Sequence, residues 1–197
     1  FILSHKKYKD NILSIAGDIS KEKTINEIIK KAISKFKRID ILVNNAGFSI
    51  FDVMVNSKTK DFDAMFATNV KAVYLLTRGF LPYMIKHNGG TIINISSLAG
   101  KQGFDTGSIY CATKHSVMGM SRALFLEVRK YNIRVIAVCP GTVDTDFFRK
   151  ESNTTIYANR NTVVKPEDIA ETCLFAASLP INSTVSEIEV RPTNPMK

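Results

Sequence analysis

A tyrosine and a lysine four positions apart, Tyr110 and Lys114, are the residues of this sequence best suited to acid–base chemistry. In a helix, side chains at that spacing lie on one face. A phenol, with a pKa near ~10, is a weak acid at neutral pH, but a neighbouring ammonium stabilises its anion and lowers its pKa. Such a pair can protonate or deprotonate the oxygen of a carbonyl or an alcohol. The same spacing also occurs between ordinary neighbours on a helix surface, so the surrounding residues must decide between the two interpretations.

Two more polar residues stand where they can join that chemistry. Ser97 comes thirteen residues before Tyr110 and follows an apolar run at 91–95 that predicts a strand. Ligands of open α/β sheets bind at the carboxyl ends of strands, where a hydroxyl can share the charge that develops on a substrate oxygen. Asn69 lies in an otherwise apolar helical segment and needs a partner if it is buried. It is either structural or holds a water on a proton path, and Ser97 either contacts substrate or only caps its turn.

Apolar bursts that alternate with helical patterns predict the elements that carry these residues. The alternation favours an α/β fold, and we expect the later part of a doubly wound, Rossmann-type parallel sheet in a single domain over residues 1–197. The polar stretch 144–165 lacks periodicity, which is typical of lids and binding loops. The predicted strands are 11–16, 39–43, 91–95, 133–138 and 185–190, and the predicted helices are 24–36 with Ser20 as N-cap, 60–87 bent or interrupted at Pro82, 108–131, and 167–179 with Pro166 at its start.

Composition argues against several other classes of protein. The 197 residues carry a formal net charge of +9, but the lysines are scattered among acidic residues and lack the clustered basic face of a nucleic-acid-binding protein. The three cysteines and three histidines show no metal-ligand spacing, so we expect no metal site. No apolar run reaches the roughly 20 residues that span a bilayer, and the first residues lack the layout of a signal peptide. We therefore expect a cytoplasmic protein that acts on a small molecule, with no membrane partner.

Five linked motifs resemble, in order and spacing, those of the classical short-chain dehydrogenases/reductases, over about residues 11–190. The resemblance implies an NAD(P)-dependent oxidoreductase that transfers a hydride between the nicotinamide cofactor and a small or medium carbonyl or alcohol. The final segment from Lys165 looks like that of subfamilies acting on 3-oxoacyl groups or hydroxy acids. The motifs are DILVNNAG at Asp40–Gly47, Asn69-Val70, NISS at Asn94–Ser97, Tyr110-x-x-x-Lys114, and PGTVDT at Pro140–Thr145.

The resemblance also implies roles for individual residues. Tyr110 would donate or accept the proton, Ser97 would orient the substrate oxygen, and Lys114 would lower the pKa of Tyr110 and bond the nicotinamide ribose. Asn69 would hold a water that links Lys114 to solvent, which makes these four the predicted catalytic residues, with Ser97 and Tyr110 contacting substrate. Asn44 would brace the central strand. Besides Tyr110 and Lys114, the residues expected to bind the cofactor are Asp18 and Ile19 at the adenine, Asn45 at the adenosine ribose with Ala46 and Gly47 beside it, and Val143 and Thr145 at the nicotinamide end with Pro140 and Gly141 beside them.

One part of the family pattern is missing. The family begins with a strand and a glycine-rich loop that sets backbone N–H groups against the pyrophosphate, and nothing in Phe1–Gly17 matches it. By analogy with the dinucleotide fold, about forty further residues would precede Phe1 and carry the first β-α-β portion of the sheet. The residue that separates NAD from NADP would lie there too, and we favour NADP because of the positive charge and the family's reductive members.

Three expectations concern the alternative function, the assembly and the two phenylalanines after the last motif. The absent phosphate loop leaves a non-catalytic binding or regulatory relative as the alternative, although the presence of Ser97, Tyr110 and Lys114 argues against it. Family members usually pair through two long helices, here 60–87 and 108–131, so we expect a homodimer or homotetramer. Phe147 and Phe148 either line the substrate pocket or anchor the lid.

Overall fold

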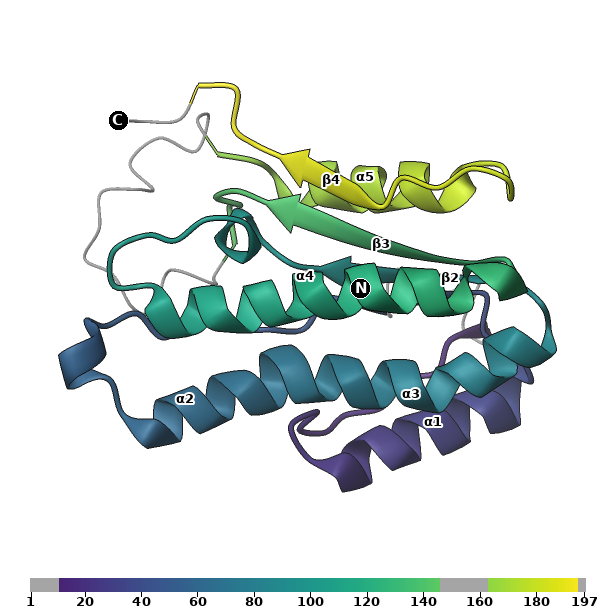
Figure 1. Ribbon diagram of the computed structural model, residues 1–197. Helices are drawn as coiled ribbons and strands as arrows, with labels where there is room; N and C mark the ends of the chain where they lie inside the picture. The colour runs from purple at the N-terminus through teal and green to yellow at the C-terminus, as the bar shows by residue number, and fades with distance from the viewer. Residues whose placement is uncertain (1–10, 146–162, 195–197) are drawn as a thin grey trace.

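Four parallel strands form one sheet in the computed structural model, which describes residues 11–145 and 163–194 (Figure 1). Each strand pairs in parallel with the next one along the chain, and Ile92 of the second strand registers with Val135 of the third. This arrangement is the predicted α/β class. The strands, in sheet order, are β1 (Ile41–Asn44), β2 (Gly90–Ile95), β3 (Ile133–Pro140) and β4 (Glu187–Val190).

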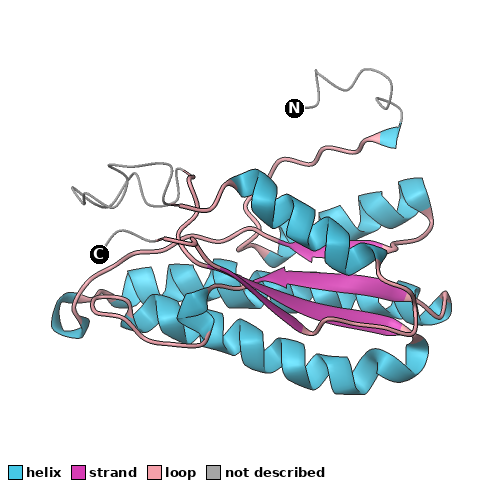
Figure 2. Cartoon of the chain, turned by 90° about the horizontal axis from the view of Figure 1, so that it is seen from above, coloured by secondary structure: helices cyan, strands magenta, loops and turns pink. Residues whose placement is uncertain are grey.

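Helices cover both faces of the sheet. Helices α1, α2–α3 and α4 lie side by side on one face, and α5 packs on the other (Figure 1 and Figure 2). The helices are α1 (Glu22–Phe36), α2 (Thr59–Phe66), α3 (Ala72–Lys86), α4 (Ser108–Val128) and α5 (Pro166–Ser178); a π-helical segment, η4 (Ala67–Lys71), joins α2 to α3, and short 3-10 turns occupy η3 (Met54–Asn56), η5 (Leu98–Gly100) and η6 (Arg129–Tyr131).

Alternate residues of the central strands point into two separate cores. Ile92 and Val135 pack with Phe80 of α3 and its neighbours, whereas Ile93 and Ile136 pack against the α5 side. The alternation follows from the two-residue period of a strand. Each fully buried aliphatic side chain contributes roughly 1.5–3 kcal/mol, so β2 and β3 are held from both faces. The carboxyl ends of these strands, where the predicted motifs lie, are therefore well anchored.

Most predicted elements are confirmed to within a few residues, but the strand at 11–16 is not. Residues 12–16 have no regular secondary structure, and no strand in the described part of the chain lies beside them. A strand needs a ladder partner for its N–H and C=O groups, and an apolar run cannot supply one by itself. β1 forms the sheet edge instead, and its Ile41 and Val43 side chains stay 49% and 48% exposed. The sheet thus shows four strands where five were expected.

Two details of the predicted helices also need correction. Lys21, not Ser20, occupies the N-cap position of α1, because Asp18 accepts from the Ser20 N–H at 2.9 Å and the turn before the helix is one residue longer. Of the two effects predicted for Pro82, interruption is wrong, since α3 runs through it to Lys86, and a bend stays a prediction. The departure from regular α-helix lies earlier, in the π-helical segment η4. Such π segments are often found at functional sites.

Candidate active site

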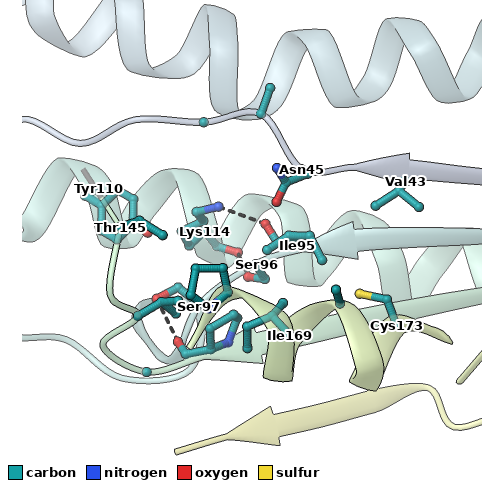
Figure 3. A pocket seen from close by; sticks show the side chains of 17 residues that line it. Val43, Asn45, Ile95, Ser96, Ser97, Tyr110, Lys114, Thr145, Ile169 and Cys173 are labelled. Atoms are coloured by element: carbon teal, nitrogen blue, oxygen red, sulfur yellow. Dashed lines mark hydrogen bonds between the residues drawn. The ribbon is translucent and has the colours of Figure 1, made fainter. Parts of the chain in front are cut away.

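A cavity of about 760 Å³ opens at the carboxyl ends of β1, β2 and β3, between α4 and α5 (Figure 3). Because the carboxyl ends of parallel strands meet at one edge of the sheet, loops far apart in sequence line the same space. Its lining contains most of the predicted site: Asn45, Ala46, Gly47, Ser97, Tyr110, Lys114, Pro140, Gly141, Val143 and Thr145.

The three side chains predicted to converge do lie together. Tyr110 and Lys114 stand one turn apart on α4, and each is only 5% exposed. Ser97 follows β2, and its hydroxyl lies within hydrogen-bonding reach of the Tyr110 phenol. The Ser97 Oγ also accepts from the Ala99 N–H at 3.1 Å and lies 3.4 Å from the Pro140 carbonyl oxygen, to which it donates. A phenol and a hydroxyl in direct contact can share one substrate oxygen between them.

Lys114 reaches across the strand ends toward the loop after β1. Its Nζ donates to the Ile95 carbonyl oxygen at 2.9 Å and lies 5.8 Å from the centre of the Tyr110 ring. A Cβ added at Gly47 would lie 3.7 Å from that Nζ and 3.1 Å from the Asn69 Oδ1. Gly47 therefore lets the loop after β1 pass close to Asn69 and to the lysine.

Burial sets the pKa of both groups on α4. It raises the pKa of Tyr110 to about 12, although the hydrogen bond from Ser97 acts in the opposite direction. Burial also lowers the pKa of Lys114 to about 8. Burial is the largest influence on both pKa values, and the expected lowering of the Tyr110 pKa by Lys114 stays a prediction. Both groups are pushed toward their neutral forms.

Asn69 lies behind the cavity wall. It is buried in the π-helical segment, its Oδ1 accepts from the Phe48 N–H at 3.0 Å, and its Nδ2 donates to the Phe48 carbonyl at 2.8 Å and to the Thr113 hydroxyl at 3.2 Å. The amide therefore fastens the loop after β1 to α4. Its structural role is visible in these contacts, and the water-holding role stays a prediction.

Other predicted residues divide between the cavity and the scaffold. Asp18 and Ile19 are not among the lining residues; Asp18 instead caps the turn before α1, and Ile19 packs against the core near Ile25. Asn44 braces the strands as expected, with its Nδ2 donating to the Asn94 Oδ1 at 2.8 Å. Val143 forms a bridge with Val164 at the cavity mouth. Phe147 and Phe148 lie outside the described residues.

Seven lining residues were missed by sequence reasoning, and together they form a mainly apolar wall. Val43, Ile95 and Ser96 could have been found, because they end β1 and β2 and the strand-end rule applies to them. The rest come from the start of α5, whose distance in sequence gives no local signal that it returns to the site. The missed residues are Val43, Ile95, Ser96, Pro166, Ile169, Ala170 and Cys173.

The residues that line the cavity fit a cofactor with a flat ring and a ribose. The close approach at Gly47, the buried Lys114 and the apolar wall match a ring and a ribose better than a freely hydrated ion. Within residues 11–145 and 163–194, no cluster of three or more His, Cys, Asp or Glu side chains could hold a metal ion. The same described ranges contain no helix long and apolar enough to cross a membrane.

Comparison with known proteins places the chain in a family. The sequence profile of the short chain dehydrogenase family matches residues 2–155. The NADP-dependent 3-hydroxy acid dehydrogenase of Schizosaccharomyces pombe is 33% identical over 195 residues, which span 95% of this chain and 75% of that protein. The 3-oxoacyl-[acyl-carrier-protein] reductase FabG of Thermotoga maritima is 37% identical over 159 residues, or 78% of this chain and 65% of that protein.

Solved structures agree with the sequence comparison. The structure described as ElxO with NADP bound matches with a TM-score of 0.85 and 32% identity, over 94% of this chain and 79% of that one. The chain belongs to the short-chain dehydrogenase/reductase family. It is accordingly an oxidoreductase of the class that acts on CH–OH groups.

Proposed function

We propose that this protein interconverts a carbonyl and an alcohol with NADP(H), and that Tyr110, Ser97 and Lys114 carry the proton chemistry. The observation that supports this most strongly is the contact between the Ser97 hydroxyl and the Tyr110 phenol, with the Lys114 Nζ beside the same ring. The dinucleotide would supply or accept the hydride when bound. The chain itself must then orient the substrate oxygen and move one proton.

Each residue has a distinct task in this proposal. The Tyr110 Oη gives its proton to the oxygen of the carbonyl during reduction and takes it back during oxidation. The Ser97 Oγ holds that oxygen in place and shares its developing charge. Lys114 keeps the cofactor ribose beside the phenol, and Asn69 holds the loop after β1 and positions a water behind the lysine. A neutral phenol suits the reductive direction, because it can only donate while its pKa stays above the working pH.

We propose that the cofactor lies along the cavity. We assign the nicotinamide end to Pro140, Gly141, Val143 and Thr145, and the adenosine side to Asn45, Ala46 and Gly47, with Asp18 and Ile19 further out. NADP is favoured over NAD because the S. pombe relative is NADP-dependent and the ElxO structure holds NADP. The whole of residues 1–197 would form one such dinucleotide-binding domain.

Substrate class is proposed from the relatives and the apolar wall. Two relatives act, by their names, on 3-hydroxy acids and on 3-oxoacyl carrier proteins, so we propose a 3-oxo or 3-hydroxy acyl compound of small or medium size. The test is a panel of 3-hydroxybutyrate, an acetoacetyl thioester and a simple ketone, each with NADPH or NADH and full-length protein, followed by absorbance of the reduced nicotinamide. We expect turnover of a 3-oxo compound with NADPH. If folded protein turns over none of these compounds, the result would favour a non-catalytic relative.

Assembly and location are part of the same proposal. We propose a homodimer or homotetramer that pairs through α2–α3 and α4, where Phe62, Tyr74 and Leu126 are exposed. Sedimentation at micromolar concentration should show an oligomer, and a monomer would count against it.

The free thiols of Cys111, Cys139 and Cys173 fit a reducing cytoplasm.

A further inference from the structure

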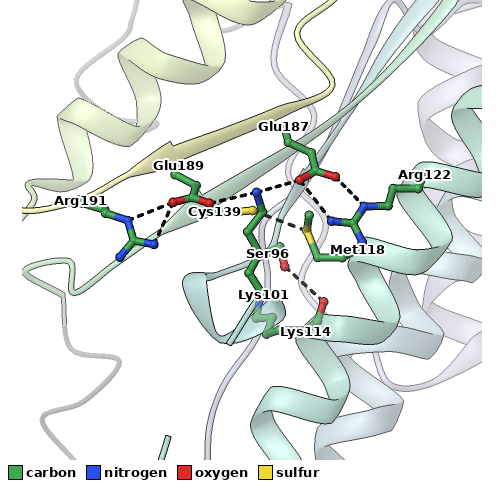
Figure 4. Close-up of polar contacts among 9 residues, drawn as sticks. All are labelled: Ser96, Lys101, Lys114, Met118, Arg122, Cys139, Glu187, Glu189 and Arg191. Carbon is green, nitrogen blue, oxygen red and sulfur yellow. Dashed lines mark hydrogen bonds and ion pairs between the residues drawn. The ribbon is translucent and has the colours of Figure 1, made fainter. Parts of the chain in front are cut away.

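A cluster of five charged side chains joins the loop that carries Ser97 to β4 and to α4 (Figure 4). Lys101 lies at its centre, with its Nζ 2.8 Å from the Glu187 Oε2 and 3.0 Å from the Glu189 Oε1. Arg122 of α4 binds Glu187 through two nitrogens, at 2.6 and 3.3 Å. Arg191 completes the cluster by pairing with Glu189 at 2.8 Å. The Ser97 loop is thereby tied to segments nearly ninety residues away in sequence.

This cluster differs from an ordinary surface ion pair. An isolated exposed pair contributes little, about 0–1 kcal/mol, because water screens it and both side chains lose freedom. Here the side chains of Lys101 and Glu187 are only 25% and 24% exposed, and each acidic group accepts from two cations. Such a network with bidentate arginine contacts holds its members in one geometry. Lys101 is therefore fixed in position as well as neutralised.

Hydrogen bonds within the turn connect Lys101 to Ser97. The Gly100 and Lys101 N–H groups donate to the Ser97 and Leu98 carbonyl oxygens at 2.9 Å each, and the Ala99 N–H donates to the Ser97 Oγ. A Cβ added at Gly100 would lie 2.9 Å from the Lys114 carbonyl oxygen, so the turn presses directly on α4. A shift at Lys101 would consequently be passed to the Ser97 hydroxyl.

We propose that Lys101, held by ion pairs with Glu187 and Glu189, is a positioning residue that holds the Ser97 hydroxyl against Tyr110. Lys101 does not touch the reacting atoms, and it acts only through the turn 97–101. The inference rests on the proposed function for its catalytic consequence, but the fixing of the turn is a property of the fold. These two parts can be measured separately.

The catalytic part is tested in full-length protein with the best substrate of the panel. Lys101→Met should lower kcat about tenfold while the Kd for NADPH changes less than about twofold, since misplacement of a catalytic group costs rate rather than cofactor affinity. Lys101→Arg, which keeps the charge, should restore most of the rate. Lys86→Met, at an exposed position on α3, is the matched control and should leave kcat unchanged.

A double-mutant cycle separates positioning from general weakening of the fold. In a Ser97→Ala background, Lys101→Met should have no further effect on kcat, because the group that it positions is gone. A tenfold loss that persists in that background would overturn the proposal, and so would an unchanged kcat in the single variant.

Amide hydrogen exchange tests the turn without any turnover. Lys101→Met should speed exchange of the amides of residues 99–102 by about tenfold or more, while those of β2 at 91–95 keep their wild-type rates. Unchanged exchange at 99–102 would refute the proposal that the ion pairs of Lys101 fix the turn, even if the protein proves inactive on every substrate. If the wild-type protein turns over none of the substrates in the panel, the proposed function is refuted instead. Failure of the positioning role and failure of the proposed function are therefore distinguishable.

Discussion

Lys114 brings an ammonium group into the interior of the protein, where its Nζ donates to the Ile95 carbonyl oxygen at 2.9 Å. Burial lowers the pKa of this lysine to about 8 from an ordinary 10.5. The folded state therefore binds the proton less tightly than the unfolded chain does. At neutral pH the buried charge of Lys114 therefore lowers the free energy of unfolding. Such a loss of stability is common at side chains that serve chemistry.

Replacing this lysine should make the protein more stable. Lys114→Met keeps the length of the side chain and removes the buried charge, so the free energy of unfolding at pH 7 should rise by roughly 1–2 kcal/mol after the lost hydrogen bond is counted. The gain should fade as pH rises from about 8 to about 10.5, because over that window the wild type's lysine is already neutral when folded and still protonated when unfolded. Urea unfolding across this pH range measures it.

The matched control for this prediction is Lys30→Met on the exposed side of α1. It should change stability by less than about 0.5 kcal/mol at every pH, as surface substitutions usually do. A Lys114→Met variant that is less stable than the wild type at pH 7 would show that the ammonium is stabilised by contacts other than those described.

Sequence could predict which side chains meet but not how they titrate. Ser97, Tyr110 and Lys114 were predicted together because strand ends and helix spacing are local properties that place side chains. Burial raises the pKa of Tyr110, and this burial comes from packing by residues such as Phe51 and Met65. Packing of that kind has no signature in the local sequence.

At the scale of elements, a buried chain of polar side chains ties β1, β2 and α4 together. The Asn44 Nδ2 donates to the Asn94 Oδ1 at 2.8 Å, and the Asn94 Nδ2 donates to the Ser121 Oγ at 2.8 Å. Ser121 in turn donates to the Val117 carbonyl at 2.7 Å, and Thr77 of α3 accepts from Asn44 at 3.3 Å. Since α4 carries Tyr110 and Lys114, this chain fixes the helix to the strands whose ends form the cavity.

Breaking the chain at its centre should destabilise the fold. Asn94→Leu removes one hydrogen bond each from the buried Asn44 and Ser121, which keep only Thr77 and Val117 as partners, and each unmade bond to a buried group costs about 1–3 kcal/mol. We expect a loss of roughly 2–4 kcal/mol in the free energy of unfolding, measured with urea. Thr77→Val, which removes only the longest bond of the set, should cost about 1 kcal/mol. Equal losses in the two variants would contradict a central role for Asn94.

The order and type of the elements were largely predictable, and the exceptions share one cause. Residues 11–16 have the composition of a strand, but pairing depends on a neighbour that the segment cannot specify. The part played by Ile169 and Cys173 of α5 in the cavity depends likewise on where that helix packs. The sequence shows local periodicity, but it does not show which distant segments pair or pack with one another.

Considering the whole molecule, the net charge of +9 is offset locally at β4, where Glu187 and Glu189 gather three cations. Hydrogen bonds from Arg122 and Lys101 lower the pKa of Glu187 to about 2. Because the folded value lies below the model-peptide range, the ionised group stabilises the protein above pH ~4.5. That contribution is lost as pH falls toward about 2.

Acid unfolding should therefore depend in part on the Glu187 carboxylate. Wild-type protein should lose stability between about pH 4.5 and pH 2, and Glu187→Gln should show a shallower slope over the same window. Stability of both proteins, followed by circular dichroism during urea unfolding at each pH, measures the difference. Parallel slopes would mean that Glu187 does not contribute to acid unfolding.

The most direct test of the whole account is the removal of one oxygen atom, by Tyr110→Phe in the full-length protein. Single-turnover oxidation of NADPH by the best substrate should slow by about 10²–10⁴-fold, the usual contribution of a positioned general acid. The Kd for NADPH, measured by its fluorescence, should stay within about twofold, because the ring and its packing remain. A variant that transfers hydride at nearly the wild-type rate would contradict the assignment of Tyr110 as the proton donor.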